Sequence, residues 1–517
     1  MNKKNRKYKI GIILTVLTLF MAGCTPVVES ESTSEDSVSE DSVSEDSVSE
    51  TMTDIEEEDF EEALDPEEKV VELDIEFAEV EYKSVDYVDS FNANQVITCS
   101  DGDDIYITSS GVYEFTGDYT KSAIVVDVDK DSDKGIVYLL LNNANISSET
   151  GTPINILEAK DVVILLVEGS ENTITQGAIV TEDEDFPGAA IYSKADTVIA
   201  GTGSLEITTL YNDAINSRDD LILEGVSLTI SAVGDGIVAK DYLAVSDVTM
   251  DITAGGDGMK ATNDDESDKG SFIIQSGSIV IVSEKDALSA ANTLQIDDGD
   301  FTLTTGGGYV EILNNITVGE GAGNTIQPSS QLEYSMKALK SYNMIINGGT
   351  FVISSYEDAI HANNELLING GDLTMSTGDD AVHADVQLTI NDVVLYVEVG
   401  YEGIEAQEII INGGEILVVV LDDAVNGSSS DGYVEINDGY IYLYSRGDGL
   451  DSNGDLTITG GTIILHTEAV YTGGDSEVDV SGTLTVTGGT IMDEEGNEID
   501  PTQSSFGGMN SKVPSRR

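Results

Sequence analysis

The sequence predicts an all-β chain folded as a right-handed parallel β-helix, a solenoid with rungs of about 22 residues. The main evidence is a repeat that recurs in the segments 343–363, 365–385 and 407–427. Each segment has an apolar run, a glycine turn, alternating apolar residues, and then an acid, a small residue and an aliphatic residue. A unit of this length buries its apolar face only by stacking on its neighbours.

The pattern inside each repeat indicates strands. Side chains alternate with period two in 350–354, 372–376 and 440–444, and most of the aliphatic residues are β-branched. Leucine-rich repeats have a similar length, but their Leu-rich frame is absent. A parallel β-helix with two or three short strands per turn is the remaining solenoid.

Stacking in register places residues about 22 apart at the ~4.8 Å spacing of neighbouring strands. The glycine pairs 348–349, 370–371 and 413–414 then mark a common bend, where a positive φ carries no Cβ penalty. The expected inward column contains Phe351, Leu373, Leu395, Ile416, Ile441 and Ile463. The expected outward column beside it contains Val352, Thr374, Tyr396, Leu417 and Tyr442.

The charge of the chain limits its partners. There are 97 acidic and 23 basic residues, which give a net charge of −74 at pH 7. Such a surface repels nucleic acid and anionic lipid and attracts divalent cations, so we expect no nucleic-acid partner. Only two cysteines occur, Cys24 and Cys99, so there is no disulfide framework.

Residues 1–23 predict a lipoprotein signal peptide, with a basic start followed by the apolar run Ile10–Met21. The sequence Met21-Ala22-Gly23-Cys24 resembles the lipobox of bacterial lipoproteins, and this resemblance implies that Cys24 is lipid-modified and becomes the mature N-terminus. The alternatives are a plain cleaved signal or an uncleaved anchor. All three predict an exported protein, and the lipobox predicts a cell-surface protein that contacts the membrane through its lipid anchor alone.

The remaining chain divides by composition. Residues 24–68 predict a disordered acidic linker, because this stretch cannot bury a core. Residues 69–496 predict the β-helix, interrupted by a Gly-rich insertion at 305–334, and residues 497–517 predict a disordered tail. We expect a monomer.

The strongest chemical signal is what we call the acid column, the acids that close successive repeats. Its members are Asp213, Asp235, Asp257, Asp286, Asp358, Asp380, Glu402, Asp423 and Asp448, with Lys337 in one acid position. Stacked carboxylates ~4.8 Å apart repel by roughly 1 kcal/mol per pair in water, and Ca²⁺ relieves this because it takes six to eight oxygen ligands. Alternatively, each Asp caps its own bend through a hydrogen bond. The candidate calcium ligands are Asp213, Asp235, Asp257, Asp358, Asp379, Asp380, Glu402, Asp422, Asp423 and Asp448.

Three residues further along each repeat runs a second column, which we call the polar row. It contains Asn216, Lys260, Ser289, Lys340, His361, His383, Glu405, Asn426 and Asp451. His361 above His383, with Asp385 and Glu405 nearby, indicates either a transition-metal site or a plain stacked surface pair.

A tyrosine row is expected late in the helix, formed by Tyr396, Tyr440, Tyr442 and Tyr444. A flat aromatic strip can stack on sugar rings, so these residues are the candidate carbohydrate-binding residues. Alternatively, a loop or the C-terminal segment covers the strip.

These features together resemble the β-helical, calcium-containing carbohydrate-binding domain family of bacterial surface proteins, which is built like pectate lyases. The matching segments are 167–177, 211–225, 253–264, 346–363, 376–385 and 447–462. The resemblance implies binding of cellulose or of pectin-type polysaccharide such as polygalacturonate, without cleavage.

Two other functions remain open. A calcium-dependent pectate-lyase-like enzyme would need a basic residue to remove the proton α to a carboxylate. The candidates are Arg218, Arg446, Lys260, Lys337 and Lys340, and they form no compact catalytic cluster in the sequence pattern. We therefore predict no catalytic residues. The third possibility is a structural adhesin or spacer.

Overall fold

The structure is a computed structural model that describes residues 79–501, except 84–86, 90, 92–95, 99–103, 121–122, 150, 179–187, 310–333 and 468–475. The chain divides into two units, Met1–Val70 and Val71–Arg517, and all the described residues lie in the second. The predicted signal peptide 1–23, Cys24, the linker 24–68 and Cys99 lie outside the described residues. So do most of the 305–334 insertion and the tail beyond residue 501.

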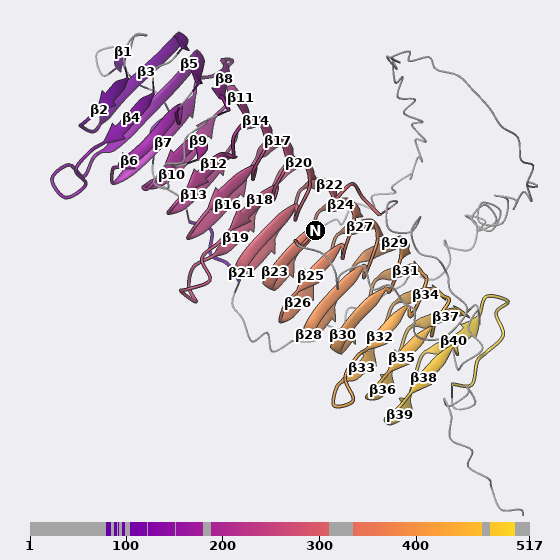
Figure 1. Ribbon diagram of the computed structural model, residues 1–517. Helices are drawn as coiled ribbons and strands as arrows, with labels where there is room; N and C mark the ends of the chain where they lie inside the picture. The colour runs from indigo at the N-terminus through magenta and orange to yellow at the C-terminus, as the bar shows by residue number, and fades with distance from the viewer. Residues whose placement is uncertain are drawn as a thin grey trace, which may run out of the picture. The chain divides into compact units, whose positions relative to one another are not determined.

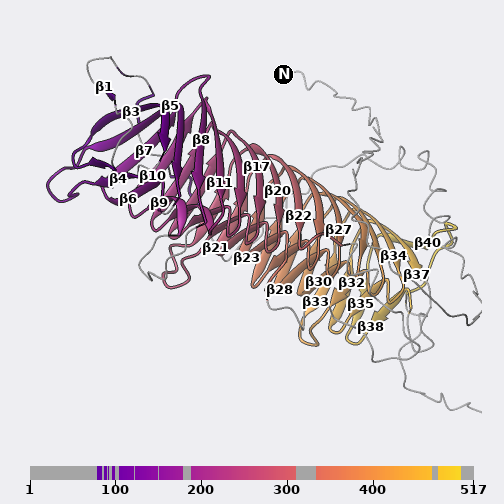
Figure 2. The same ribbon diagram turned by 45° about the horizontal axis from the view of Figure 1, so that its top comes forward.

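The described strands form a parallel β-solenoid of about 14 turns, which confirms the predicted fold class. The 40 strands belong to one continuous sheet and stack in chain order from β1 to β40 (Figure 1). The turned view shows the successive coils lying one behind the other (Figure 2). Within the described ranges there is no helix long and apolar enough to cross a membrane.

Each turn contributes to three faces, which we call sheets 1, 2 and 3. Sheet 1 contains β8 (Glu171–Gln176), β11 (Ser204–Thr209), β14 (Ser227–Ala232), β17 (Val248–Ala254), β20 (Gly277–Ser283), β22 (Asp300–Thr305), β24 (Thr350–Ser355), β27 (Asp372–Thr377), β29 (Val394–Gly400), β31 (Glu415–Val420), β34 (Tyr440–Ser445), β37 (Thr462–Thr467) and β40 (Thr490–Asp493). Sheet 2 contains β2 (Ile105–Ile107), β4 (Ile124–Asp127), β6 (Ile154–Glu158), β9 (Ala189–Ser193), β12 (Asp213–Ser217), β15 (Ile237–Ala239), β18 (Met259–Ala261), β25 (Ile360–Ala362), β32 (Val425–Gly427), β35 (Leu450–Ser452) and β38 (Val478–Val480).

Sheet 3 contains β1 (Val96–Thr98), β7 (Asp161–Leu166), β10 (Asp196–Gly201), β13 (Asp220–Glu224), β16 (Tyr242–Ser246), β19 (Ser271–Ile274), β26 (Glu365–Ile368), β33 (Tyr433–Ile436), β36 (Asp455–Ile458) and β39 (Leu484–Val486). Six strands turn a corner and belong to two sheets. Four run from sheet 2 into sheet 3: β21 (Leu288–Ile296), β23 (Leu339–Ile346), β28 (Val382–Ile390) and β30 (Ile404–Ile411). Two run from sheet 3 into sheet 1: β3 (Gly111–Thr120) and β5 (Ile136–Ser148).

The rungs average ~24 residues rather than the predicted 22. Most of the late rungs keep the shorter step, as in the pairing of Phe351 with Leu373. The excess comes from longer connections in some turns. Met259 pairs with Leu288, 29 residues later, because of a loop between sheets 2 and 3, and Leu288 pairs with Leu339, 51 residues later, because the insertion lies between sheets 1 and 2.

The register confirms the predicted inward and outward columns. Phe351, Leu373, Leu395 and Ile416 are paired in succession, and all are buried. The rings of Phe301 and Phe351 stack with their centroids 4.5 Å apart. Burial of each such side chain stabilises the fold by about 1.5–3 kcal/mol, and each contact joins adjacent turns.

The second glycine of each predicted pair has the left-handed backbone that the bend requires. Gly349, Gly371 and Gly414 have φ values of 104°, 114° and 102°. A Cβ on Gly414 would lie 2.6 Å from the carbonyl oxygen of Val393, so the close approach of the neighbouring turn also excludes a side chain.

An asparagine ladder runs beside these bends and was not foreseen in the sequence. Each Asn donates through Nδ2 to the Oδ1 of the residue one turn earlier, over distances of 2.7–3.0 Å. The ladder begins on Asp297, runs through Asn347, Asn369, Asn391, Asn412 and Asn437, and ends on Thr459.

The segment before β1 packs on the outer face of sheet 3. Val80, Tyr82, Tyr87 and Phe91 contact an apolar cluster that includes Tyr242. The backbone N–H of Val80 donates to Gln295 and that of Val88 donates to Tyr138, so the segment runs against the direction of the stack. At the other end, Ile499 N–H donates to the carbonyl of Ile491, so residues 497–501 of the predicted tail fold back on β40.

Candidate functional site

The acid column stands at the corner between sheets 1 and 2, where its members lie in register. In its first four turns, the Oδ1 atom of each Asp accepts the backbone N–H of the next column residue. Asp235, Asp257, Asp286 and Lys337 donate in this way over 2.8–3.1 Å. The same bond joins Asp380 to Asp358 (3.3 Å) and Asp448 to Asp423 (2.6 Å). Each Asp side chain therefore caps the bend of the following turn. The alternative prediction from the sequence, that each Asp caps its own bend, is not what these bonds show.

The second oxygen of most column acids is held by the polar row. Asn216 Nδ2 donates to Asp213 (2.8 Å), and His361 and His383 each place Nδ1 2.7 Å from their column acid. In these pairs the acid and its polar-row partner are three residues apart, so the beginning of a single sheet 2 strand positions both side chains.

Small residues before the column acids leave space for these carboxylates. A Cβ on Gly256 would collide with Oδ1 of Asp235, and one on Gly447 would collide with Oδ1 of both Asp422 and Asp423. The Gly-Asp pairs at 234–235, 256–257 and 447–448 therefore reflect the stacking of one carboxylate over the next backbone.

The N-terminal part of the column contains its own cation. Lys260 Nζ lies 2.6 Å from Asp235 Oδ2 and 2.8 Å from Asp257 Oδ2. Burial raises the pKa of Asp257, and the charge of Lys260 opposes this effect. The ammonium group thus bridges two of the predicted calcium ligands. The Oδ1 atom of Asn216 in the same region is buried without a hydrogen-bond partner.

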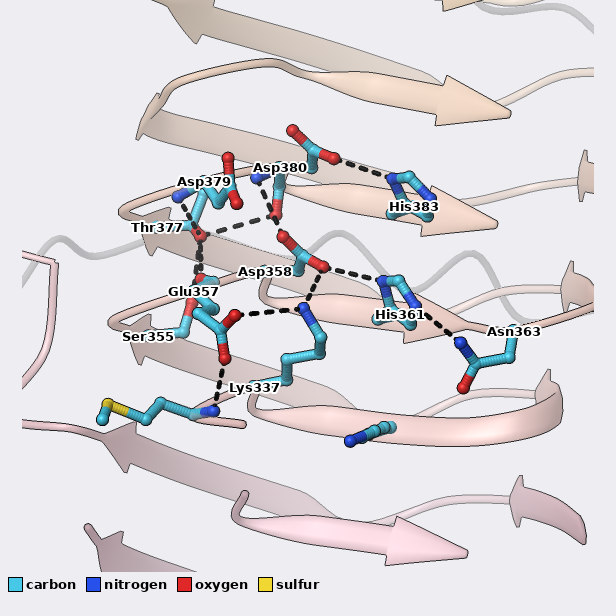
Figure 3. Close-up of polar contacts among 12 residues, drawn as sticks. Lys337, Ser355, Glu357, Asp358, His361, Asn363, Thr377, Asp379, Asp380 and His383 are labelled. Carbon is cyan, nitrogen blue, oxygen red and sulfur yellow. Dashed lines mark hydrogen bonds and ion pairs between the residues drawn. The ribbon is translucent and has the colours of Figure 1, made fainter. Parts of the chain in front are cut away.

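The middle of the column also contains a lysine. Lys337 Nζ lies 2.6 Å from Asp358 Oδ2 and 3.7 Å from Glu357 Oε1 (Figure 3). Burial raises the pKa of Asp358, but the hydrogen bond from His361 and the charge of Lys337 outweigh it and hold that pKa well below its usual range. Next to them, burial and the charges of Asp380 and Asp358 raise the pKa of Asp379 to about 8.

The two histidines lie on adjacent strands, β25 and β28, as Figure 3 shows. Their rings stack 4.6 Å apart and 11° from parallel. His383 Nε2 lies 3.2 Å from Asp385 Oδ1, and its Nδ1 lies between Asp380 and Glu405. Burial lowers the pKa of His383, but the hydrogen bonds to Asp380 and Glu405 outweigh it and raise that pKa to about 11. Beyond them, burial and the charges of Asp380 and Glu405 raise the pKa of Glu402 to about 10.

The C-terminal part of the column is a group of carboxylates. Oxygens of Asp423, Asp448 and Asp451 lie within 4.8 Å of one another. Burial and the charges of Asp422, Asp448 and Asp451 raise the pKa of Asp423 to about 8, although Asp448 N–H donates to it. Burial and the charges of Asp448, Asp479 and Asp422 raise the pKa of Asp451 to about 7.

Two buried acceptor atoms without a hydrogen-bond partner belong to the same part. One is Oδ1 of Asn426, whose backbone pairs with that of Asp451 and whose Nδ2 donates to Glu402. The other is Oγ of Ser476, a residue that is 4% exposed and whose N–H donates to Asp448. Ser476 takes the column position after Asp448, and no sequence signal identified it because the repeat decays there.

The tyrosine row lies on the outer face of sheet 1, beside the acid column. Tyr396, Leu417 and Tyr442 are paired in succession, and Tyr440 and Tyr444 flank Tyr442 on β34. All four tyrosines are half-buried. The ring of Tyr444 stacks on His466, 4.6 Å away, so part of the row is covered by its neighbours.

The structure brings the predicted metal ligands together in separate groups. Asp358, Asp379 and Asp380 form one, and Asp423 and Asp448 join Asp451 in another. In the N-terminal part, Asp213 accepts a hydrogen bond from Asn216, and Asp235 and Asp257 form ion pairs with Lys260. A further group that was not foreseen, Asp196 with Asp219 and Asp220, lies at the start of β10 and β13.

The chain is similar to known proteins. A family described as "Carbohydrate-binding domain-containing protein" matches residues 101–381 and 380–505. A protein of the same description from Acetivibrio thermocellus is 36% identical over 237 residues, which cover 45% of this chain and 82% of that protein. A solved structure titled as the polysaccharide lyase-like protein from C. thermocellum, gadolinium derivative, is 29% identical. The match covers 41% of this chain and 90% of the chain in that structure, with a TM-score of 0.39.

The family match extends over most of the β-solenoid and includes the acid column, the polar row and the tyrosine row. The chain therefore belongs to the family of carbohydrate-binding domain-containing proteins.

Proposed function

We propose that this protein binds polysaccharide of the cellulose or polygalacturonate type at the cell surface without cleaving it, through a β-helix stabilised by Ca²⁺. The observation that supports calcium binding comes from the C-terminal end of the acid column. There, buried acceptor atoms of Asn426 and Ser476 without hydrogen-bond partners accompany three clustered carboxylates.

The residues at this end fit calcium. Asp423, Asp448 and Asp451 offer carboxylate oxygens, and Asn426 and Ser476 offer neutral oxygens, which is the donor set that Ca²⁺ prefers. When bound, the ion would neutralise the mutual repulsion that raises the pKa of Asp423 and Asp451. Lys260 and Lys337 form ion pairs with column acids elsewhere, whereas this end has the buried acceptors of Asn426 and Ser476 without hydrogen-bond partners.

The tyrosine row supplies the polysaccharide contact in this proposal. Tyr440, Tyr442 and Tyr444 lie on β34, and the chain turns from the end of that strand directly to Asp448. A neutral glucan would stack its apolar ring faces on the row. A polyuronate would also need cations to approach a chain with a net charge of −74.

Two alternatives are weaker. A lyase needs a basic residue with a lone pair, but Lys260, Lys337 and Lys340 each lie within 4.0 Å of column carboxylates. A purely structural spacer gives no role to the tyrosine row. Anchoring through a lipidated Cys24 is part of the proposal, and loss of detergent-phase partitioning in Cys24→Ser tests it.

The experiment measures Ca²⁺ and polysaccharide binding on the full chain. We expect calorimetry to detect Ca²⁺ binding that Asp451→Asn and Ser476→Ala weaken. Asp235→Asn is the matched control from the same column, because Asp235 is already paired with Lys260. Equal loss in all three variants would contradict the placement of the site.

In affinity gels with cellulose or polygalacturonate, we expect wild type to be retarded, and Tyr442→Ala to be retarded less. Chelation should weaken retardation by polygalacturonate more than by cellulose. Release of unsaturated product from polygalacturonate would favour the lyase, and absence of both retardation and product would favour the spacer.

A further inference from the structure

A group of two histidines from the polar row and the neighbouring Asp385 lies outside the proposed calcium site, and its donor atoms differ from those of that site. The chain has three histidines in 517 residues. Two of them, His361 and His383, occupy equivalent positions in adjacent turns and are stacked in parallel. The third, His466, is on sheet 1 and is bonded to Glu494.

Each of the two rings is fixed by a buried carboxylate. His361 Nδ1 is 2.7 Å from Asp358 Oδ2, and His383 Nδ1 is 2.7 Å from Asp380 Oδ2. Asp358 and Asp380 are 3% and 7% exposed, so they hold the rings rigidly. A carboxylate on Nδ1 is the usual outer partner of a metal-bound histidine, because it fixes the ring orientation and makes the other nitrogen a better ligand.

The outward nitrogens converge on a third ligand, Asp385. Its Oδ1 atom is 3.2 Å from His383 Nε2 and 3.9 Å from His361 Nε2. One nitrogen from each ring and a carboxylate oxygen all lie within 4.8 Å of one another. Ligands of a tetrahedral ion at about 2.0 Å are about 3.3 Å apart, so small side-chain shifts would close the set.

Hydrogen-bond donors now occupy the space between these three atoms. Asn363 Nδ2 lies 3.2 Å from His361 Nε2 and 3.3 Å from Asp385 Oδ2, so it is the donor in both contacts. Because the amide nitrogen of Asn363 can only donate, Nε2 of His361 accepts this hydrogen bond through its lone pair. Asn363 is exposed and can turn aside. The side chain of Asp385 is 45% exposed, and those of His361 and His383 are 12% and 18% exposed, so solvent reaches the group from the side of Asp385.

We propose that His361 Nε2, His383 Nε2 and Asp385 bind a divalent transition-metal ion of the Zn²⁺ class, leaving an open coordination position toward solvent. Imidazole nitrogen selects such ions over Ca²⁺, which takes oxygen ligands. On binding, the ion displaces the Asn363 amide from His361 and releases to solvent the proton that His383 Nε2 shares with Asp385, so the affinity for the ion increases with pH. Asp358 and Asp380 stay in place, since they contact Nδ1 of the two rings and not Nε2.

The test is calorimetric titration of the full chain with Zn²⁺ in the presence of excess Ca²⁺, which saturates oxygen-only sites. We expect one Zn²⁺ to bind, and we expect His361→Gln, His383→Gln and Asp385→Asn each to weaken it by about 10-fold or more. His466→Gln is the matched control and should change nothing. The proposal is overturned if wild type binds Zn²⁺ no more tightly than the His361→Gln/His383→Gln double variant, or if His466→Gln is the variant that loses binding.

A second readout does not depend on the folding of the variants. Electron paramagnetic resonance of wild type loaded with one equivalent of Cu²⁺ counts the nitrogen ligands. Coupling to two imidazole nitrogens supports the site, whereas coupling to one or none overturns it. Asp385→Asn alters an exposed side chain, so a loss of metal binding without a change in melting temperature separates ligation from a structural role.

Discussion

At the scale of single residues, the acid column serves two purposes with its two carboxylate oxygens. Oδ1 caps the next turn, as in the bond from Asp257 N–H to Asp235, while Oδ2 faces a cation such as Lys260. A carboxylate that replaces a backbone acceptor at a bend cannot be moved away to relieve repulsion. A nearby cation must therefore neutralise its charge. Lys337 is the most buried of the lysines that do this in the column, at 9% exposed.

We predict that Lys337→Met lowers the free energy of unfolding by about 3 kcal/mol, because it leaves the buried Asp358 and Glu357 without their cation. Thermal unfolding followed by calorimetry in the presence of chelator measures the change. Lys340→Met is the control, since Lys340 Nζ is 3.5 Å from Asp286 and its side chain is 34% exposed, so its loss should cost less than about 1 kcal/mol. Equal losses would show that the burial of Lys337 is not what matters.

At the scale of elements, adjacent turns are joined by more than their backbone hydrogen bonds. The asparagine ladder ties each bend to the one before it, and every interior amide both donates and accepts. Such chains polarise one another, and a gap leaves one donor and one acceptor without partners. The ladder covers the turns from Asp297 to Thr459, which include the regular repeats at 343–427.

We predict that Asn391→Ala destabilises the solenoid by about 2 kcal/mol, because Asn412 loses its acceptor and Asn369 loses its donor. The neighbouring variant Asp392→Ala changes an exposed residue and should have little effect. Comparison of the two melting curves checks this. If Asn391→Ala lowers the stability no more than Asp392→Ala does, the hydrogen bonds of the ladder do not contribute to the stability of the solenoid.

At the scale of the whole solenoid, each turn contacts only its neighbours, so stability is close to a sum of local terms. The column contains lysines near β18 and β23, and the proposed calcium site at Asp423, Asp448 and Asp451 lies near β32 and β35. Under the proposed function, removal of calcium affects the C-terminal turns alone.

We predict that chelation increases amide hydrogen exchange in β32, β35 and β38 but not in β12, β15 and β18. Mass-spectrometric exchange of the full chain, with and without chelator, measures both groups in one sample. The turns that contain Lys260 are the internal control. A uniform increase along the stack, or no increase anywhere, would contradict a calcium site at the C-terminal end.

The repeat made the fold and the columns predictable, because period two and a step of about 22 residues leave few ways to bury the apolar side chains. The superposition of Asp358 with Asp380 and of His361 with His383 followed from the same spacing. Features outside the repeat were not predictable. Ser476 takes a column position where the repeat has already decayed, and the segment near Tyr82 packs on sheet 3 from far away in the chain.

The sequence by itself determined which residues stack on one another, since register in a solenoid is a matter of counting along the chain. The tertiary structure decided which of those stacked acids already have a partner. Asp235 and Asp257 share Lys260, Asp358 has Lys337 and His361, and the orphan oxygens of Asn426 and Ser476 lie at the far end. The physical reason is that a carboxylate's need for a cation depends on burial and on neighbours within a few ångströms, and these are set only when the turns close.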